Sequence, residues 1–557
     1  MVILKRTLVI MIMLSGIFAL TCNDLTPGNS ERYKFHFEVK VPVFPDNNFI
    51  ITEFGAVGDG IFLNTEAIRK AITTCVEQGG GKVIIPAGIW HTGPIQLKTN
   101  VNLCIEKGAI IVFSKDLDDY PYISTFYEGR KDFRAMPLLY AEGAENIAIT
   151  GKGILNGSGE VWRPVKKFKM TEDQWEELIN SGGVLNENGD MWWPDQYAYE
   201  ASLDPDKYRS SSLRDEEREK YKAFFRPPMV QLVNCNVILI EGPVFQNSPN
   251  WCIHPAICTD LTVNDITIIN PWYAQNGDGI DFESCNRVRI TNSFFDVGDD
   301  AICLKSGKDK EGRERGIPCQ FVEVNNCVVL HGHGGFVVGS EMSGGVHDVW
   351  VSNCSFTGTD IGLRFKSTRG RGGVVEKINI ENIRMIDIPT DAISFNLFYA
   401  GSAPTETTET AFSSFTADFP EITEETPEFR DILIRNVTCK GANRAIQIMG
   451  LPEMPVNTLT IENSVFSAIH GINCIFANNI VIKDLQISTR DYPAVNIWNS
   501  SKIDVTSLSG NNEILFKIGG TVTKDILIRT ENVTEIDKML MVGEEINTEE
   551  IRIETLN

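Results

Sequence analysis

Four residues in the middle of the chain have the types and spacing that general acid–base catalysis uses. Asp299 and Asp300 are adjacent, and when the strand-like repeats around them are aligned, Asp278 shares the position of Asp300 and His333 shares that of Asp299. Crowded carboxylates cannot all keep ordinary pKa values, because each charge raises the pKa of its neighbours. One acid can then stay protonated while another is ionised, as cleavage of a glycosidic bond requires. An isolated Asp-Asp pair is more typical of a solvated turn, but the shared positions favour catalysis.

Two cations follow on the next repeat. Arg364 and Lys366 are two residues apart, which places both side chains on one face of a strand. They lie within about four coils of the acids, or about 15 Å at the usual strand spacing. Arg369 and Arg371 add two more cations, although a solvated loop explains this second pair as well. As a set, the four suit a polyanionic ligand.

These residues lie within a run of internal repeats. Short strand-like segments end in Asn about every 27 residues, at Asn292, Asn326, Asn353, Asn382, Asn436 and Asn463. Asn at a fixed point after a strand is typical of a tight left-handed bend or of a side-chain ladder. The repeat predicts a solenoid of stacked strands.

A second strand in each repeat alternates with period two. One apolar position holds Ile280, Ile302, Phe336, Leu363, Ile393 and Ile446, and another holds Phe282, Leu304, Val338, Phe365, Phe395 and Ile448. These positions should face the core. The side chains between them, Asp281, Glu283, Lys305, Arg364 and Lys366, should then point outward.

The fold expected from this pattern is all-β, a parallel β-helix, because a β-sandwich would not keep one register over six repeats. Asn64-Thr65 before a helical pattern that stops at Gly79–Gly81 predicts a capped helix closing the N-terminal end. We expect one domain over 48–557, with insertions at about 160–226 and 401–428. The first insertion carries Trp162, Trp192, Trp193, Tyr197 and Tyr199, and the second is rich in Thr and Glu.

Composition excludes several classes of protein. The net charge is −23, which argues against a general nucleic-acid binder. Residues 1–22 read as an export signal, with Lys5 and Arg6 before an apolar run, and 23–47 as a linker. Cys22 either receives a lipid, as in a bacterial lipoprotein, or is incidental to a simple secretory signal. The other cysteines form no C-x-x-C pair and read as buried core residues, although a few disulfides stay possible after export.

Several motifs together resemble a known family. NGDGID (276–281), GDDAICLKSG (298–307), GHGG (332–335) and RFKS (364–367) occur in order, with FGAVGDG and NSPNWCIHP before them. They resemble the motifs of glycoside hydrolase family 28, the polygalacturonases, over roughly residues 48–500. Gly277 stands where Thr is commoner in that family. The resemblance implies a right-handed, pectin lyase-like β-helix.

The resemblance also implies residue roles. Asp299 would be the general acid, Asp278 and Asp300 would activate a water from the opposite face, and His333 would control the protonation of the acid. Inversion would follow, with acid and base roughly 6.5–9.5 Å apart. Arg364 and Lys366 would bind galacturonate carboxylates.

Three further residues are weaker candidates. Asn276 would orient the sugar, Tyr399 lies where the family has a substrate-contacting tyrosine, and His254 is either a sugar contact or structural. We expect no metal and no cofactor.

The expected activity is hydrolysis of α-1,4-galacturonosidic bonds in pectin or polygalacturonate. Attack from chain ends is expected, because the first insertion would bring aromatic side chains over one end of the groove. Hydrolysis of rhamnogalacturonan or substituted pectin, and a non-enzymatic surface glycan-binding protein or adhesin, remain alternatives. Export would place the protein in the periplasm, on the outer membrane through a lipid on Cys22, or outside the cell; the sequence leaves its oligomeric state open.

Overall fold

The computed structural model describes residues 37–209, 213–399, 420–510, 515–531 and 539–556. Residues 35–557 form one compact unit. The expected export signal (1–22), including Cys22, lies outside the described residues, as does most of the second insertion. Among the described parts of the chain, no helix combines the length and apolar character needed to span a bilayer.

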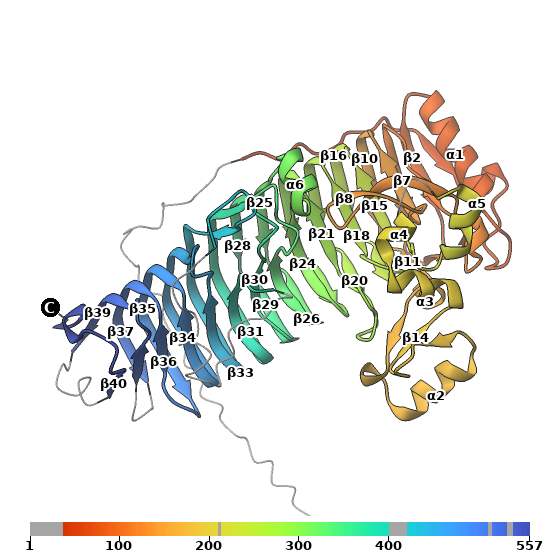
Figure 1. Ribbon diagram of the computed structural model, residues 1–557. Coiled ribbons are helices and arrows are strands. Elements are labelled where there is room, and N and C mark those ends of the chain that lie inside the picture. Colours follow the sequence, from red (N-terminus) through yellow and green to blue (C-terminus); the bar gives the residue numbers. More distant parts are fainter. Residues whose placement is uncertain (1–36, 210–212, 400–419, 511–514, 532–538, 557) are drawn as a thin grey trace, which may run out of the picture. The chain divides into compact units, whose positions relative to one another are not determined.

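The chain coils into a right-handed parallel β-helix, as predicted (Figure 1). In the central part each coil contributes three short strands, and each strand pairs in parallel with its counterpart on the next coil. The first stack holds β15 (Val230–Val233), β18 (Ile253–Ala256), β21 (Ile280–Glu283), β24 (Asp300–Lys305), β27 (Gly334–Val338) and β30 (Leu363–Lys366).

The second stack holds β16 (Asn236–Glu241), β19 (Thr259–Asn264), β22 (Asn286–Thr291), β25 (Cys319–Asn325) and β28 (Val346–Ser352). The third holds β17 (Val244–Gln246), β20 (Thr267–Ile269), β23 (Phe294–Asp296), β26 (Val328–Gly332) and β29 (Ser355–Thr359).

Toward the C-terminus the strands become longer and continue the same stacks. The first stack runs on through the ends of β31 (Val374–Asn396), β33 (Ile432–Met449) and β34 (Val456–Ile475). It then continues in β36 (Val495–Trp498), β38 (Phe516–Gly519) and β40 (Leu540–Val542), while β35 (Ala477–Thr489), β37 (Ser501–Gly510), β39 (Lys524–Thr530) and β41 (Ile551–Thr555) form the neighbouring stack.

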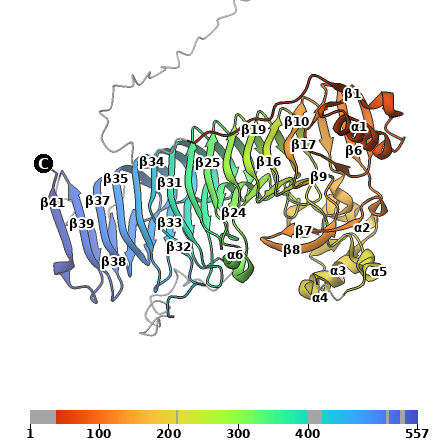
Figure 2. The same cartoon turned by 90° about the horizontal axis from the view of Figure 1, so that it is seen from above.

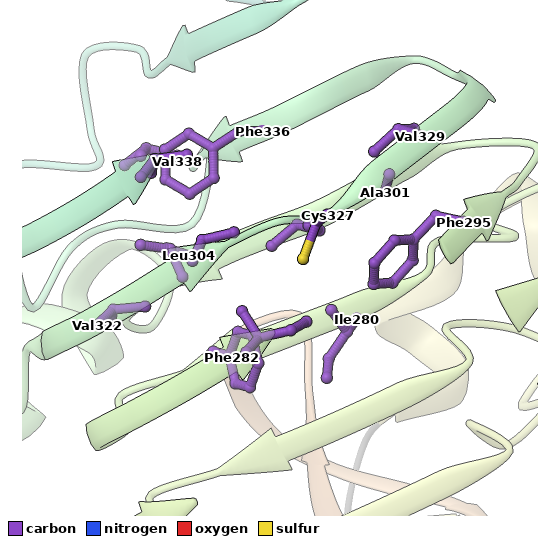
Figure 3. Close-up of a cluster of buried hydrophobic side chains, with 14 of the residues drawn as sticks. Ile280, Phe282, Phe295, Ala301, Leu304, Val322, Cys327, Val329, Phe336 and Val338 are labelled. Carbon is purple, nitrogen blue, oxygen red and sulfur yellow. The ribbon is translucent and has the colours of Figure 1, made fainter. Parts of the chain in front are cut away.

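The two apolar positions predicted for the first stack are confirmed. Ile280 pairs with Ile302, Ile302 with Phe336, and Phe336 with Leu363, and the register continues to Ile393 and Ile446. All are fully buried, and Figure 3 shows part of this core with Phe282, Leu304 and Val338. Period-two alternation therefore located the core of six successive coils.

The repeated asparagines form both predicted structures, the left-handed bend and the side-chain ladder. Each has a positive φ, for example 54° at Asn326 and 57° at Asn353. Their side-chain amides also bond from coil to coil: Nδ2 of Asn382 donates to Oδ1 of Asn353 at 3.1 Å, and Nδ2 of Asn436 donates to Asn382 at 3.1 Å. The ladder fixes the corner of each coil against the next.

The predicted helix is present as α1 (Thr65–Glu77), at the N-terminal end of the solenoid (Figure 1). Its apolar face, including Ile68 and Ile72, is buried on β1 (Asn48–Ile50) and β2 (Gly81–Ile85). The expected N-cap is wrong, since the Asn64 side chain makes no bond to the helix. It accepts from the amide of Val57 at 2.7 Å and donates to the carbonyls of Val57, Phe62 and His91, so it secures the preceding loop.

The first insertion folds into a small subdomain. It contains an antiparallel sheet of β12 (Val165–Lys166), β13 (Val184–Leu185) and β14 (Met191–Trp193), with α2 (Glu172–Asn180), α3 (Gln196–Leu203), α4 (Pro205–Arg209) and α5 (Asp215–Arg218). Both views show these helices beside the N-terminal half of the solenoid (Figures 1 and 2).

The aromatic residues of this insertion mostly do not face a groove, contrary to expectation. Trp162 is fully buried, and Trp192 and Trp193 keep only 7% and 9% exposure. Trp192 packs with Trp175 and Val165 in the subdomain's own core. A 65-residue insertion must bury apolar surface of its own to fold, and its tryptophans serve that purpose; of the five predicted aromatics, Tyr197 is exposed and Tyr199 is half-buried.

The twelve cysteines that the structure describes are all free thiols, and all but Cys104 are buried. The core interpretation of these residues is therefore confirmed.

Candidate active site

The three predicted acids come together at the start of two neighbouring strands of the first stack. Asp300 begins β24, Asp278 lies two residues before β21, and the amide of Gly279 donates to the Asp300 carbonyl at 2.9 Å. One carboxylate oxygen each from Asp278, Asp299 and Asp300 lies within 4.8 Å of the other two. The expected separation of roughly 6.5–9.5 Å is therefore wrong, because neighbouring coils hold these side chains closer than the separation rule assumes.

Asp300 is held as an ionised group by both predicted cations. Nη1 of Arg364 lies 3.1 Å from its Oδ1, and Nζ of Lys366 lies 2.6 Å from its Oδ2. Burial raises the pKa of Asp300, but the charges of Lys366 and Arg364 outweigh it and leave that pKa below its ordinary value. The two cations thus neutralise an acid of the site.

The pKa of Asp278 is shifted in the opposite direction. It is 3% exposed, and its Oδ1 receives no hydrogen bond. Burial, followed by the charges of Asp281, Asp299 and Asp300, raises its pKa well above the ordinary value. The environment of Asp278 therefore favours its protonated form.

Asp299 pairs with His333. Nδ1 of His333 lies 3.2 Å from Oδ1 of Asp299, and its Nε2 lies 3.6 Å from Oδ2 of Asp360. Burial raises the pKa of Asp299, but the hydrogen bond and charge of His333, with Lys366 and Arg364, bring it below the ordinary value. The same bond to Asp299 raises the pKa of His333. Both shifts favour an imidazolium beside a carboxylate in this pair.

Two of the weaker candidates lie beside this cluster. The Tyr399 ring stands 5.0 Å from Nζ of Lys366 and 5.7 Å from the guanidinium carbon of Arg364. Asn276 has a φ of 54°, and its Oδ1 accepts from Arg226 at 2.7 Å. Both keep partial exposure at the edge of the cluster.

His254 is not placed to contact a sugar, and the structural interpretation holds for it. Its side chain is fully buried; Nε2 lies 3.1 Å from Glu283, and Nδ1 lies 3.1 Å from the amide of Gln231. Glu283 is fully buried as well and also binds Arg315 at 2.8 Å. The side chains of Asp281, Glu283 and Lys305 leave the core as predicted, but a second layer covers them.

That second layer comes from outside the repeats. It consists of the hairpin β7 (Tyr122–Tyr127) and β8 (Arg130–Ala135), the helix α6 (Asp309–Arg315), and Trp251, whose ring lies 4.6 Å from Nζ of Lys305. These elements cover Asp281, Glu283 and Lys305, which lie further along β21 and β24 than Asp278 and Asp300.

Arg369 and Arg371 do not join the cationic set. Arg369 pairs with Glu453, and Arg371 pairs with Asp309 and approaches Glu341. Both charges are neutralised by neighbouring loops, so the loop interpretation is the better one.

Sequence analysis missed Lys169, which the first insertion places at the site. Its side chain is buried, and Nζ donates to the carbonyls of Trp272 and Gly298, both at 3.3 Å. Gly298 directly precedes Asp299, so the insertion is anchored to the catalytic loop. Burial lowers the pKa of Lys169, and the charge of Asp299 opposes this effect. In the sequence, Lys169 is a lysine inside an insertion, and sequence alone does not show that it contacts a distant loop.

The spacing of the three acids could also hold a cation. However, Arg364 and Lys366 engage Asp300, and His333 engages Asp299. Positive side chains already supply the charge that a metal would bring, so the donor set fits a metal poorly.

Comparison with known proteins places this geometry in a family. The model of glycosyl hydrolases family 28 matches residues 166–435. An exo-poly-alpha-D-galacturonosidase from Dickeya chrysanthemi is 29% identical over 418 residues, which are 72% of this chain and 64% of the relative. A probable polygalacturonase from Vitis vinifera is 25% identical over 74% of this chain and 73% of its own length.

Solved structures agree. A hyperthermoactive exopolygalacturonase from Thermotoga maritima superposes with a TM-score of 0.64 and 31% identity, covering 77% of this chain and 89% of the other. A Yersinia enterocolitica family 28 exopolygalacturonase shares the fold, with a TM-score of 0.60 and 24% identity. With ordered motifs, β-helix and acid cluster all in agreement, the chain belongs to glycosyl hydrolase family 28 and is a glycoside hydrolase.

Proposed function

We propose that the protein hydrolyses α-1,4-galacturonosidic bonds of polygalacturonate and acts from chain ends. The observation that carries the proposal is a cluster of three acids in three different environments, with two cations beside it. The relatives named above as polygalacturonases and exopolygalacturonases support this substrate. Uronate carboxylates would replace or share the contacts that Arg364 and Lys366 make with Asp300.

We assign a role to each acid from its environment. Asp300 is ionised and takes the proton of the attacking water. We assign Asp278, whose pKa is raised, as the protonated acid that orients that water by donating a hydrogen bond. The pair of Asp299 and His333 supplies the proton to the glycosidic oxygen, with the imidazole as its store.

Inversion follows from the proposed roles, because water rather than a carboxylate attacks the sugar carbon. A retaining mechanism would instead need Asp300 or Asp278 as the nucleophile. The close spacing of the acids, taken alone, resembles that of retaining enzymes at about 5–5.5 Å. The anomer of the first product therefore tests the assignment directly.

The first insertion supports attack from chain ends, although through a different contact from the one expected. Lys169 fastens it to the loop before Asp299, and Tyr273, in the loop before Asp278, packs against its core. Between the insertion and this coil lies a cavity of about 270 Å³, lined by Lys166 and Trp193 on one side and Asn276 on the other. A wall on the N-terminal side of the acids limits how far a polymer extends past them.

Incubation with polygalacturonate tests substrate and mode together. An end-acting enzyme releases monomer or dimer while viscosity falls slowly, and the reducing-sugar yield is high from the start. A rapid fall in viscosity with mixed oligomers would refute end attack. A complete lack of new reducing ends on polygalacturonate would refute the function, and would favour a glycan-binding protein instead.

We also propose that the protein is exported, with its N-terminal segment as the signal and a lipid on Cys22. The support is the charged-then-apolar pattern of residues 1–22 followed by cysteine. Cell fractionation of the full chain beside a Cys22→Ala variant tests this. Membrane association in the parent and its loss in the variant support lipidation, while identical fractionation contradicts it.

A further inference from the structure

A second cavity lies on the C-terminal coils, far along the same stack that carries the acids. We call it the distal cavity; its volume is about 300 Å³, and its lining includes Arg444, His470, Asn473, Tyr492, Trp498 and Lys517. β34, β36 and β38 supply most of the lining. None of these residues belongs to the acid cluster or its cations.

The register places this cavity in line with the predicted carboxylate contacts. Successive pairs lead from Arg364 through Ser394, Gln447, Asn473 and Asn496 to Lys517. A parallel series leads from Lys366 to Trp498. Five strand steps separate Arg364 from Lys517, which is about 24 Å at the usual strand spacing.

A serine and three amide side chains occupy the positions between these two ends. Nδ2 of Asn496 donates to Oδ1 of Asn473 at 2.7 Å, and Nδ2 of Asn473 donates to Oε1 of Gln447 at 3.2 Å. Ser394, Gln447 and Asn473 keep only 4–5% exposure, so these three side chains belong to the packing of the fold. Asn496 is half-buried in the lining of the distal cavity, where its amide can both donate to and accept from a hydroxyl-rich ligand.

Two aromatic rings give the distal cavity a platform. The Trp498 ring extends over Gly519 on the next strand. A Cβ at position 519 would lie 2.2 Å from the ring, so only glycine leaves room for the indole there. Tyr492 is 63% exposed at the rim. Flat amphipathic rings of this kind stack on the apolar face of a sugar while its hydroxyls remain hydrated.

The charge of the cavity differs from that of the whole protein. Arg444, His470 and Lys517 line it with one acid, Asp491, in a chain of net charge −23. His470 lies 3.5 Å from Asp491, and Arg444 lies 3.6 Å from Asp391. Arg444 and His470 thus have acids beside them, and the lining combines side chains that can bind both the hydroxyls and the carboxylates of an acidic sugar.

We propose that the distal cavity binds the trailing part of an acidic polysaccharide whose end lies in the active site. The proposal rests on the function proposed above and extends it to a separate binding site. With one side of the acids walled by the first insertion, the polymer leaves along the C-terminal coils, where the strand positions of Arg364 and Lys366 lead to Lys517 and Trp498. The ligand is thus a polyuronate long enough to span both sites.

Steady-state kinetics of Trp498→Ala and Lys517→Ala test the proposal. KM for long polygalacturonate should rise about fivefold or more in each, with kcat unchanged. Digalacturonate, which is too short to reach the distal cavity from the acids, should be hydrolysed at the parent rate. Lys524→Ala is the matched control, because Lys524 is exposed at the start of β39 and outside the cavity. Unchanged KM for the polymer in both variants overturns the proposal.

A binding measurement separates this proposal from the function itself. In native electrophoresis through a gel containing polygalacturonate, an Asp299→Asn chain should be retarded, and adding Trp498→Ala or Lys517→Ala should reduce that retardation. Equal retardation with and without these changes overturns the distal site. If the parent cleaves neither polymer nor dimer, the proposed function fails, while the retardation still reports on the cavity. Lys517→Ala, which shortens a half-buried side chain, keeps the test valid if Trp498→Ala unfolds.

Discussion

Replacing His333 by Gln tests which group holds the proton that the Asp299–His333 pair donates to the glycosidic oxygen. In the proposed assignment that proton lies on the imidazole of His333, whose pKa is raised first by its bond to Asp299. In the parent, the pair can supply a proton at any pH below the pKa of His333, so activity should fall on the alkaline side as that pKa is passed. Without the imidazolium, the pKa of Asp299 rises, and Asp299 must carry the proton itself.

The size of the effect follows from the contact. Nδ1 and Oδ1 are 3.2 Å apart, and the Asp299 side chain is 16% exposed, so the bond is charge-assisted and partly shielded from water. Such bonds contribute about 1.5–3 kcal/mol, and losing one in the transition state should lower kcat roughly tenfold to 150-fold. A His with a raised pKa also stabilises the fold below its unfolded pKa of about 6.5, and this contribution disappears as pH rises through the folded value. His333→Gln should therefore reduce thermal stability at pH 5 more than at pH 9.

The assay is kcat/KM on polygalacturonate across pH for parent and variant. His331→Gln is a matched control, because His331 lies two residues earlier, pairs with Asp296 at 2.9 Å and is 61% exposed. The control should keep the parent profile. If His333→Gln keeps the alkaline limb of the parent at the same pH, the imidazole does not store the proton and the reasoning is refuted.

Four other outcomes follow from the same geometry. Asp300→Asn should lower kcat by about 10²–10⁴, whereas Asp278→Asn should lose less, because an amide resembles the protonated carboxyl; equal losses in kinetic assays would contradict the protonation assigned to Asp278. Lys366→Ala removes a cause of the lowered pKa of Asp300, so the acidic limb of the pH profile should move to higher pH and kcat/KM should fall about tenfold or more. NMR early in the reaction should show the inverted anomer, and retention would make one Asp a nucleophile. Lys169→Ala should loosen the insertion and speed the loss of polygalacturonate viscosity per bond cleaved, while an unchanged ratio would remove Lys169 from the account of end attack.

The repeated part of the chain could be predicted in detail from sequence. Ile280, Ile302 and Phe336 recur at one position of an alternating strand, and in a solenoid the same position on successive coils must stack. That register alone places Asp278 beside Asp300 and His333 beside Asp299. The acid cluster was therefore predictable, because it is built from equivalent positions of neighbouring coils.

What covers the outward face could not be predicted in this way. Alternation shows that Asp281 and Glu283 leave the core, but the elements that bury them lie outside the repeat and pack through contacts distant in sequence. The burial of His254 and the reach of Lys169 depend on the same kind of contact. The pKa values of the acids likewise depend on distances and burial that motif spacing does not contain.

The reactivity of the free cysteines can measure local unfolding of the solenoid. A thiol reacts as its thiolate, and burial raises the pKa of Cys75 to about 11 and those of Cys319 and Cys474 to about 12. In the closed coil these sulfurs are therefore nearly inert to alkylating reagents at neutral pH. Because Cys75 lies in the capping helix, Cys319 in a central coil and Cys474 in β34, single-cysteine variants would measure how often each region unfolds, and in what order the coils separate.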